Sequence, residues 1–267
     1  MNRTHQVTRN LFLSATLAAA LVAVPQISFA AAPQATQGNP AAADAAARLN
    51  KKQFNNVKVD VDSNGIATLT GTVDLYEYKA DADKRVHKAK GVTAVRNDIQ
   101  VAGPTVADYV LKAKLAEKLT YDRVGYDNVF DAISIDVQNG VVTLAGHALG
   151  YPARDSALAL VSTYPGVKDV VDEVQVDPVS PMDDRIRLAE YRAIYGFPSL
   201  NKYAIDPAKT IRITVVNGNV ELDGVVDSQA DKDTANIRAN SVAGAFTVKN
   251  NLRVAGQQPE SQATASN

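Results

Sequence analysis

Asn139-Gly140-Val141-Val142-Thr143-Leu144-Ala145-Gly146 is a stretch that recurs twice more in the chain. Its other copies are Asn64-Gly65-Ile66-Ala67-Thr68-Leu69-Thr70-Gly71 and Asn217-Gly218-Asn219-Val220-Glu221-Leu222-Asp223-Gly224. Each copy ends in a glycine, and a second glycine lies 20 positions further along the chain, at Gly91, Gly166 and Gly244. The copies lie 75 and 78 residues apart, which is longer than the unit of a solenoid, so the pattern predicts three small domains.

Each repeat carries the same order of secondary-structure signals. A first helix is predicted over 41–53, 105–119 and 182–195, and a second over 76–90, 153–164 and 229–243. The second helix is expected to end at Gly91, Gly166 or Gly244 as its C′ residue. A hairpin lies between the helices, and alternating valines predict a closing strand. The expected fold is therefore α+β, with three tandem α-β-β-α-β domains, each with two helices packed on a three-stranded mixed sheet.

The hairpin registers differ between the repeats. Asn-Gly after alternating apolar residues predicts a two-residue turn, which pairs Val137 with Val142 and Val215 with Val220. In the first repeat the apolar residues are shifted by one position relative to Asn64. A three-residue loop over 63–65 with a left-handed glycine restores the pairing of Val61 with Ala67.

This register places Gly71, Gly146 and Gly224 on the buried face of the sheet, where a side chain is normally wanted. We interpret these three structural glycines as sites where a helix closely approaches the sheet. A ligand pressed against bare backbone is the alternative.

The termini differ in composition from the repeats. Residues 1–30 resemble a secretory signal peptide, with Arg3 and Arg9 before an apolar run and a small-x-small site at Ser28-Phe29-Ala30; a retained anchor is the alternative. A flexible spacer is expected over 31–40 and a disordered tail over 257–267. The domains are then predicted at 41–103, 104–179 and 180–256. Segments inserted before two hairpins, at 121–131 and 196–209, are expected to be ordered caps.

Composition argues against several classes of function. The net charge is −1, which becomes −3 without Arg3 and Arg9, and this is not the basic balance of a nucleic-acid-binding protein. The absence of cysteine excludes disulfides and a thiol-linked lipid anchor. Three widely spaced histidines and no catalytic motif predict no metal, no cofactor and no enzymatic activity.

The helix–hairpin–helix–strand order, with a glycine closing the hairpin and Gly-Val-x-x-Val entering the last strand, resembles the BON domain family. The likeness covers three copies, with Gly71, Gly146 and Gly224 at the family's signature glycine. It implies a non-enzymatic protein of the periplasm, associated with osmotic or envelope stress and binding phospholipid surfaces. It supplies no catalytic residues to carry over. The lack of cysteine sets the chain apart from lipoprotein members of the family.

Lys84, Arg85, Lys88 and Lys90 form the densest basic run outside the leader and are the candidate site for an anionic phospholipid surface. On a helix they would share one face, and a solvated helix end is the alternative reading. Weaker candidates are Lys112, Lys114 and Lys118, and a group of arginines and tyrosines on the third repeat's first helix: Arg185, Arg187, Tyr191, Arg192 and Tyr195.

Two further functions stay open at this point. One is a chaperone-like or scaffold protein that binds periplasmic or outer-membrane proteins through sheet edges or the inserted aromatic segments. The other is a sensor of a small ligand or ion, for which the sequence offers no site. Raising the salt concentration distinguishes the two binding functions. Salt screens electrostatic binding to a membrane, whereas binding of proteins through sheet edges or apolar contacts should persist.

Overall fold

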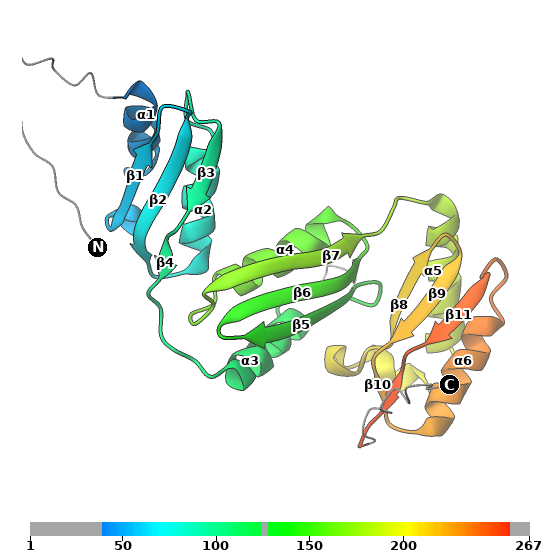
Figure 1. The fold of residues 1–267 in the computed structure, drawn as a ribbon. Helices are drawn as coiled ribbons and strands as arrows, with labels where there is room; N and C mark the ends of the chain where they lie inside the picture. Colours follow the sequence, from blue (N-terminus) through cyan, green and yellow to red (C-terminus); the bar gives the residue numbers. More distant parts are fainter. Residues whose placement is uncertain (1–38, 124–127, 257–267) are drawn as a thin grey trace, which may run out of the picture. The chain divides into compact units, whose positions relative to one another are not determined.

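The computed structural model describes residues 39–123 and 128–256. Within these ranges the buried apolar side chains form three clusters, each built from one mixed sheet and the helices packed on it (Figure 1). The α+β fold with three small mixed sheets is therefore confirmed. The predicted leader, nearly all of the spacer and the tail from 257 lie outside the described residues.

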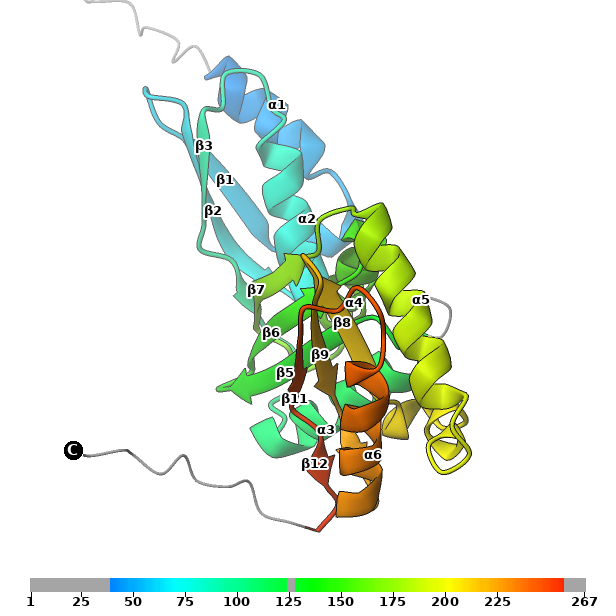
Figure 2. The ribbon, with the colours of Figure 1, turned by 90° about the vertical axis from the view of Figure 1, so that its right-hand side faces the viewer.

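In the first repeat, β1 pairs antiparallel with β2, while β3 and β4 run parallel to β2. Two helices cover one face of this sheet (Figure 2). The elements are α1 (Pro40–Arg48), the 3₁₀ helix η1 (Lys52–Phe54), β1 (Val57–Val61), β2 (Ile66–Val73), α2 (Tyr76–Val86), β3 (Ala94–Asn97) and β4 (Gln100–Val101).

The second repeat has the simplest sheet, in which the central strand β6 pairs antiparallel with β5 and parallel with β7. Its elements are α3 (Asp108–Tyr121), β5 (Ala132–Gln138), β6 (Val141–Ala148), α4 (Tyr151–Ser162) and β7 (Asp169–Val176). Leu111, Leu115 and Leu119 of α3 are buried at i, i+4 and i+8 and anchor the helix on the sheet.

The third repeat follows the same plan, with β9 between antiparallel β8 and parallel β11. Its elements are α5 (Pro181–Tyr195), the 3₁₀ helices η2 (Asn201–Ala204) and η3 (Pro207–Lys209), β8 (Arg212–Val216), β9 (Asn219–Asp223), β10 (Val225–Val226), α6 (Gln229–Asn240), β11 (Thr247–Asn250) and β12 (Arg253–Val254). The inserted segment 196–209 is ordered, as predicted, and it buries Leu200 and Tyr203. Of the other predicted cap, 121–131, residues 124–127 lie outside the described residues.

The hairpins confirm the predicted difference between repeats. Asn139 and Gly140 both have positive φ, 54° and 78°, as the two central residues of a type I′ turn require. Val137 pairs with Val142, as expected. In the first repeat only the glycine of the loop has a positive φ, 79° at Gly65, and Val61 pairs with Ala67.

The reason predicted for the glycine that closes each hairpin is wrong. No close approach of a helix explains Gly71, Gly146 and Gly224, because all three have a left-handed φ, at +115°, +103° and +141°. A Cβ atom here would meet backbone at, or up to two residues before, the start of the neighbouring strand. The distances are 1.9 Å to the carbonyl oxygen of Asn56, 2.1 Å to that of Ala132 and 2.9 Å to that of Thr210. Glycine is thus required by the left-handed backbone and by the close approach of the neighbouring backbone.

The second helix of each repeat does not end directly at Gly91, Gly166 or Gly244, which corrects another prediction. The helices stop four or five residues earlier, at Val86, Ser162 and Asn240. Two tight turns follow each helix, as in the bonds from Ala89 N to Val86 O (2.9 Å) and from Val92 N to Ala89 O (3.2 Å). Gly91, Gly166 and Gly244 lie in the second turn with φ of 82°, 98° and 97°. The first helix of the first repeat is also shorter than predicted and ends at Arg48.

One acidic side chain ties the first helix to the hairpin turn in the second and third repeats. Asp108 accepts hydrogen bonds from the backbone of Asn139 (2.7 Å) and Gly140 (2.9 Å). Asp183 does the same for Asn217 (3.0 Å) and Gly218 (2.8 Å), but it is almost fully buried. These bonds hold the turn on the start of the helix.

Replacing Asp183 with alanine is expected to cost about 2 kcal/mol of stability in the third repeat, because two amide groups lose a charged acceptor in a buried place. The matched variant Asp108→Ala should cost only about 1 kcal/mol, since water reaches its more exposed turn. Hydrogen exchange of the two hairpins measures both effects. Equal losses in the two repeats would show that burial does not govern the contribution.

Candidate functional site

The predicted basic run lies at and beyond the end of α2, and the structure divides it into two parts. Lys84 and Arg85 are in the last turn of the helix. Lys88 and Lys90 lie in the turn that leads to Gly91, so the expected single helical face is wrong. Lys84, Lys88 and Lys90 are exposed, and none of them has an ion-pair partner among the described residues.

Arg85 differs from the three lysines because its guanidinium group is engaged within the repeat. Its Nε donates to Asp81 at 2.8 Å, one helical turn earlier. The guanidinium carbon also lies 5.9 Å from the ring centroid of Phe54, a buried residue of η1. Arg85 therefore holds α2 against η1 and is a poorer candidate for contact with a partner.

The backbone beyond α2 is fixed by an acidic side chain from α1. Asp44 accepts a hydrogen bond from the amide of Lys90 (2.8 Å) and another from Arg48 Nε (3.1 Å). These two bonds hold the pKa of Asp44 below its usual value. The turn that carries Lys88 and Lys90 is thus tied to α1, while their ammonium groups face solvent.

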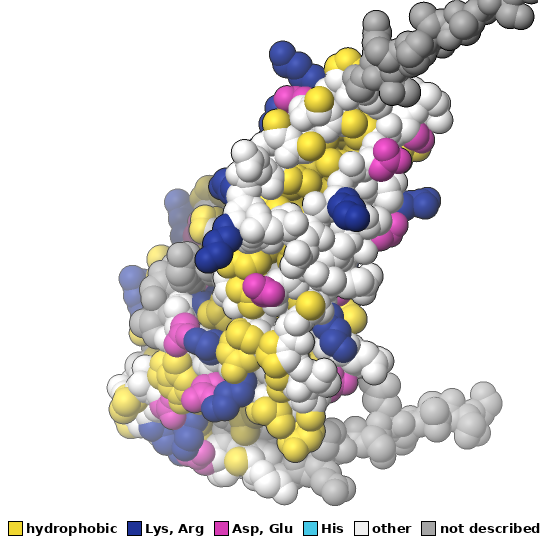
Figure 3. Space-filling view, turned by 90° about the vertical axis from the view of Figure 1, so that its left-hand side faces the viewer, with side chains coloured by type: hydrophobic (Ala, Val, Ile, Leu, Met, Phe, Trp, Pro, Cys, Tyr) yellow, Lys and Arg dark blue, Asp and Glu magenta, His cyan; other side chains and the backbone are white. Residues whose placement is uncertain are grey.

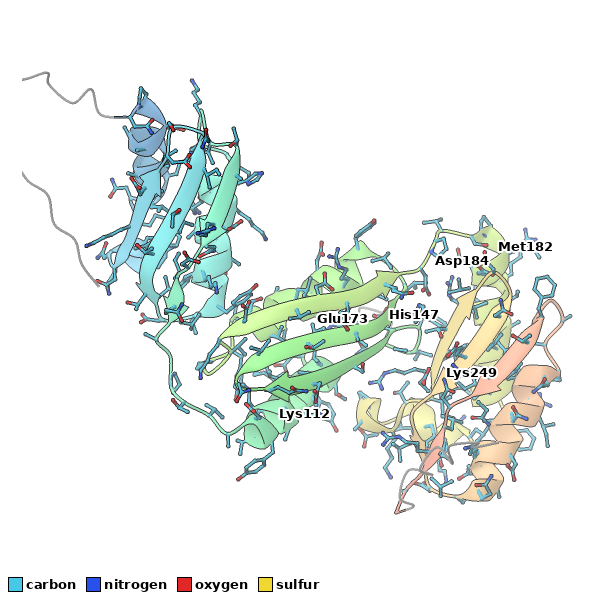
Figure 4. The ribbon with its side chains drawn as sticks, in the orientation of Figure 1. Lys112, His147, Glu173, Met182, Asp184 and Lys249 are labelled. Atoms are coloured by element: carbon cyan, nitrogen blue, oxygen red, sulfur yellow. The ribbon has the colours of Figure 1, made fainter. Side chains whose placement is uncertain are left out.

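The lysines of the second candidate site all form ion pairs. Lys112, whose place on α3 is shown in Figure 4, pairs with Asp136 at 2.8 Å. Lys114 pairs with Glu117 at 3.0 Å and Lys118 with Asp122 at 2.7 Å. The i,i+3 and i,i+4 spacings of the last two pairs were visible in the sequence, whereas the partner of Lys112 comes from β5 and was not. Three paired lysines offer little free charge to a ligand.

The third candidate, on α5, has mainly a structural role. Arg187 is buried, and its guanidinium donates to the carbonyl of Val215 (2.6 Å) and to Asp184 (2.6 Å). The Tyr195 hydroxyl donates to the carbonyl of Ile211 (2.6 Å), and burial raises its pKa. The ring of Tyr191 packs against that of Tyr195 at a tilt of 46°, with the centroids 4.9 Å apart. Arg185 and Arg192 stay exposed, so they do not form one site with the buried members.

The face shown in Figure 3 carries no dominant patch of one charge among the described residues. On the face shown in Figure 3, Lys and Arg side chains are dispersed among acidic and hydrophobic ones. Within residues 39–123 and 128–256, no group of three or more His, Asp or Glu side chains could hold a metal ion. No helix in the same ranges has the length and apolar composition to cross a membrane.

Comparison with known proteins agrees with the repeat pattern. The BON domain model matches residues 39–103, 107–178 and 199–256. Osmotically-inducible protein Y of Escherichia coli (strain K12) is 28% identical over 192 residues, which cover 69% of this chain and 91% of that protein.

Two solved structures of CdsD, a structural protein of the type III secretion system of Chlamydia trachomatis, are also similar. The first is 18% identical with a TM-score of 0.23, over 79% of this chain and 90% of the other. The second, the C-terminal domain, is 16% identical with a TM-score of 0.22, over 79% and 96%. The family model matches most of the chain in three segments, and the chain therefore belongs to the BON domain family.

Proposed function

We propose that this protein binds anionic phospholipid surfaces without catalysing a reaction, through Lys84, Lys88 and Lys90 of the first repeat. The observation that carries the proposal is that these three exposed lysines make no ion pair among the described residues, in contrast to the ion-paired lysines of α3. The ammonium group of Lys90 has only a longer-range electrostatic interaction with Asp44. A cation near an anionic membrane contributes about 1 kcal/mol, so three of them give a local attraction of about 3 kcal/mol.

The proposed setting is the bacterial envelope under osmotic stress. A relative whose name states that it is osmotically inducible supports this setting, and so does the leader-like composition of residues 1–30. We place the protein in the periplasm. We also propose that its three BON repeats span residues 41–103, 104–179 and 180–256. Because the chain has a slightly negative net charge, attraction to a membrane has to come from a local group of cations.

Replacing Lys84, Lys88 and Lys90 together with glutamine is expected to weaken binding to anionic vesicles about 100-fold, the equivalent of about 3 kcal/mol. Co-sedimentation with vesicles of phosphatidylglycerol and phosphatidylcholine measures this at low and high salt. The parent chain should bind only the anionic vesicles, and its binding should disappear well above physiological ionic strength.

The matched control is the glutamine variant of Lys112, Lys114 and Lys118, which changes the net charge by the same amount. Its binding should stay within a few-fold of the parent's, because its lysines are already paired. Equal losses in the two variants would point to net charge instead of a site. A parent chain that never sediments with vesicles rules out the proposal, and binding that resists salt favours the scaffold function.

A further inference from the structure

Glu190 occupies a core position in the third repeat. It lies on α5 between Ile186 and Ile194, at the spacing i, i+4, i+8 that places all three on the buried face of the helix. None of the Glu190 surface is exposed. The equivalent row on α3 is Leu111, Leu115 and Leu119, aligned through Asp108 and Asp183, which bind the two hairpin turns. Glu190 thus stands where the second repeat has a leucine.

The Glu190 carboxyl group has no partner in this core. Neither of its oxygens accepts or donates a hydrogen bond within the described chain. Arg187, one turn earlier, directs its Nη atoms to Asp184, Asp177 and Val215, and its Nε makes no hydrogen bond. Burial raises the pKa of Glu190 to about 8, and no neighbouring charge contributes to the shift.

No other charged group on the elements packed against α5 forms a hydrogen bond or ion pair with Glu190 within the described residues. The helix packs against β8, α6 and η2. On β8, the pKa of Arg212 is lowered by burial. On α6 and η2, Asp231 binds Lys202 (3.0 Å) and Tyr203 (2.8 Å). The remaining charged residues of α6 are Lys232, Asp233, which accepts from Gln229, and Arg238, which donates to the carbonyl of Ala193. None of these groups pairs with Glu190.

We propose that Glu190 is a proton-dependent latch, which keeps the third repeat closed while the carboxyl group is protonated and lets it open more readily as the pH rises. An isolated carboxylate in an apolar core is far less stable than the neutral acid, because it loses its hydration and gains no partner. The second repeat, with leucine at this position, lacks such a latch.

The direction in which pH changes the stability of the third repeat follows from the linkage between folding and the protonation of Glu190. The unfolded carboxyl group titrates near 4.5 and the folded one near 8. Below pH 4.5 Glu190 is protonated in both the folded and the unfolded state, and its contribution to the stability of the third repeat is fully present. Between these two values unfolding releases one proton, so the opening equilibrium constant rises about tenfold for each pH unit. Above pH 8 both states are ionised, and the loss levels off.

Hydrogen exchange of the purified chain, followed by mass spectrometry from pH 5 to 9, tests the latch. After correction for the intrinsic pH dependence of exchange, protection of α5, β8 and β9 should fall about tenfold per pH unit up to pH 8. Peptides from α3, β5 and β6 provide the internal control and should not show this slope.

The variant Glu190→Leu should remove the slope in the third repeat and raise its protection at pH 8. Should this variant fail to fold, Glu190→Gln supplies the same comparison, because an amide does not titrate in this range. A slope that persists in the folded variant would overturn the proposal. So would a parent protein whose protection does not change between pH 5 and 8.

Discussion

Replacing Gly146 with alanine is expected to destabilise the second repeat by about 3 kcal/mol or more. Two costs combine at this position. An L residue is strained at a φ of +103°, and the new Cβ would lie 2.1 Å from the carbonyl oxygen of Ala132 unless β5 and β6 separate. The separation would disturb the pair of half-buried Ile135 and buried Leu144, two positions further along the strands. Urea unfolding, resolved by hydrogen exchange of β5 and β6, measures the loss.

Gly150→Ala is the matched control within the same repeat. Gly150 has no left-handed φ, and the nearest atom to a Cβ there is Pro152 Cδ at 3.5 Å, an ordinary contact. Its effect should stay below about 1 kcal/mol. If the two variants were equally stable, the backbone at Gly146 would be able to accept a side chain, and the recurrence of glycine in all three repeats would need another cause.

The hairpins show what local sequence can predict. Asn-Gly between alternating apolar residues determines the turn type and, with it, every pair along the two strands, because the side-chain period is two. The shift by one residue in the first repeat was enough to predict a different loop and the pairing of Val61 with Ala67. These features depend on residues that are neighbours in the chain, so no knowledge of the remaining fold was needed.

Features that depend on distant backbone were not predicted correctly. The glycine at 146 was found from its spacing, but its cause is a carbonyl group on another strand, at Ala132. The ends of α2, α4 and α6 were placed too late because the tight turns beyond them keep a helix-like alternation of buried residues, as Val86 and Ala89 show. Boundaries of helices are generally the weakest part of such predictions.

The candidate site illustrates the same limit. Lysines were located easily, but the property that distinguishes them is whether an acidic partner is in reach. Lys112 finds Asp136 on a strand 24 positions away, which no local pattern shows. Lys88 and Lys90 find no such partner among the described residues, although acidic residues are as common in the chain as basic ones.

Glu190 is not among the candidate residues that the sequence analysis names on the predicted helix 182–195. A signal was present in the sequence: aligning α5 on α3 sets Glu190 against Leu115, in the middle of a buried apolar stripe. Comparing repeats position by position is therefore more informative than reading each helix alone. A charged residue at a position where another repeat buries leucine is a local conflict, and such conflicts mark places with a special role.

Tyr203→Ala is expected to destabilise the third repeat by about 3 to 5 kcal/mol, as for other large-to-small replacements in a core. Tyr203 belongs to the inserted segment, yet its side chain is fully buried. Its hydroxyl donates to Asp231 (2.8 Å) and accepts from the amide of Asp227 (2.7 Å). The insertion thereby fastens the start of α6, where Lys202 also binds Asp227 and Asp231 at 3.0 Å each.

Tyr203→Phe separates the two contributions of this side chain. The ring stays in the core and only the hydroxyl is lost, so the cost should fall to about 1 kcal/mol, with increased exchange confined to the start of α6. Thermal unfolding and peptide-level exchange provide the measurement. A small effect of Tyr203→Ala would mean that 196–209 is a surface addition which the third repeat can release. A large effect of Tyr203→Ala would mean that the insertion is part of the core of the third repeat and that the fold of this repeat depends on it.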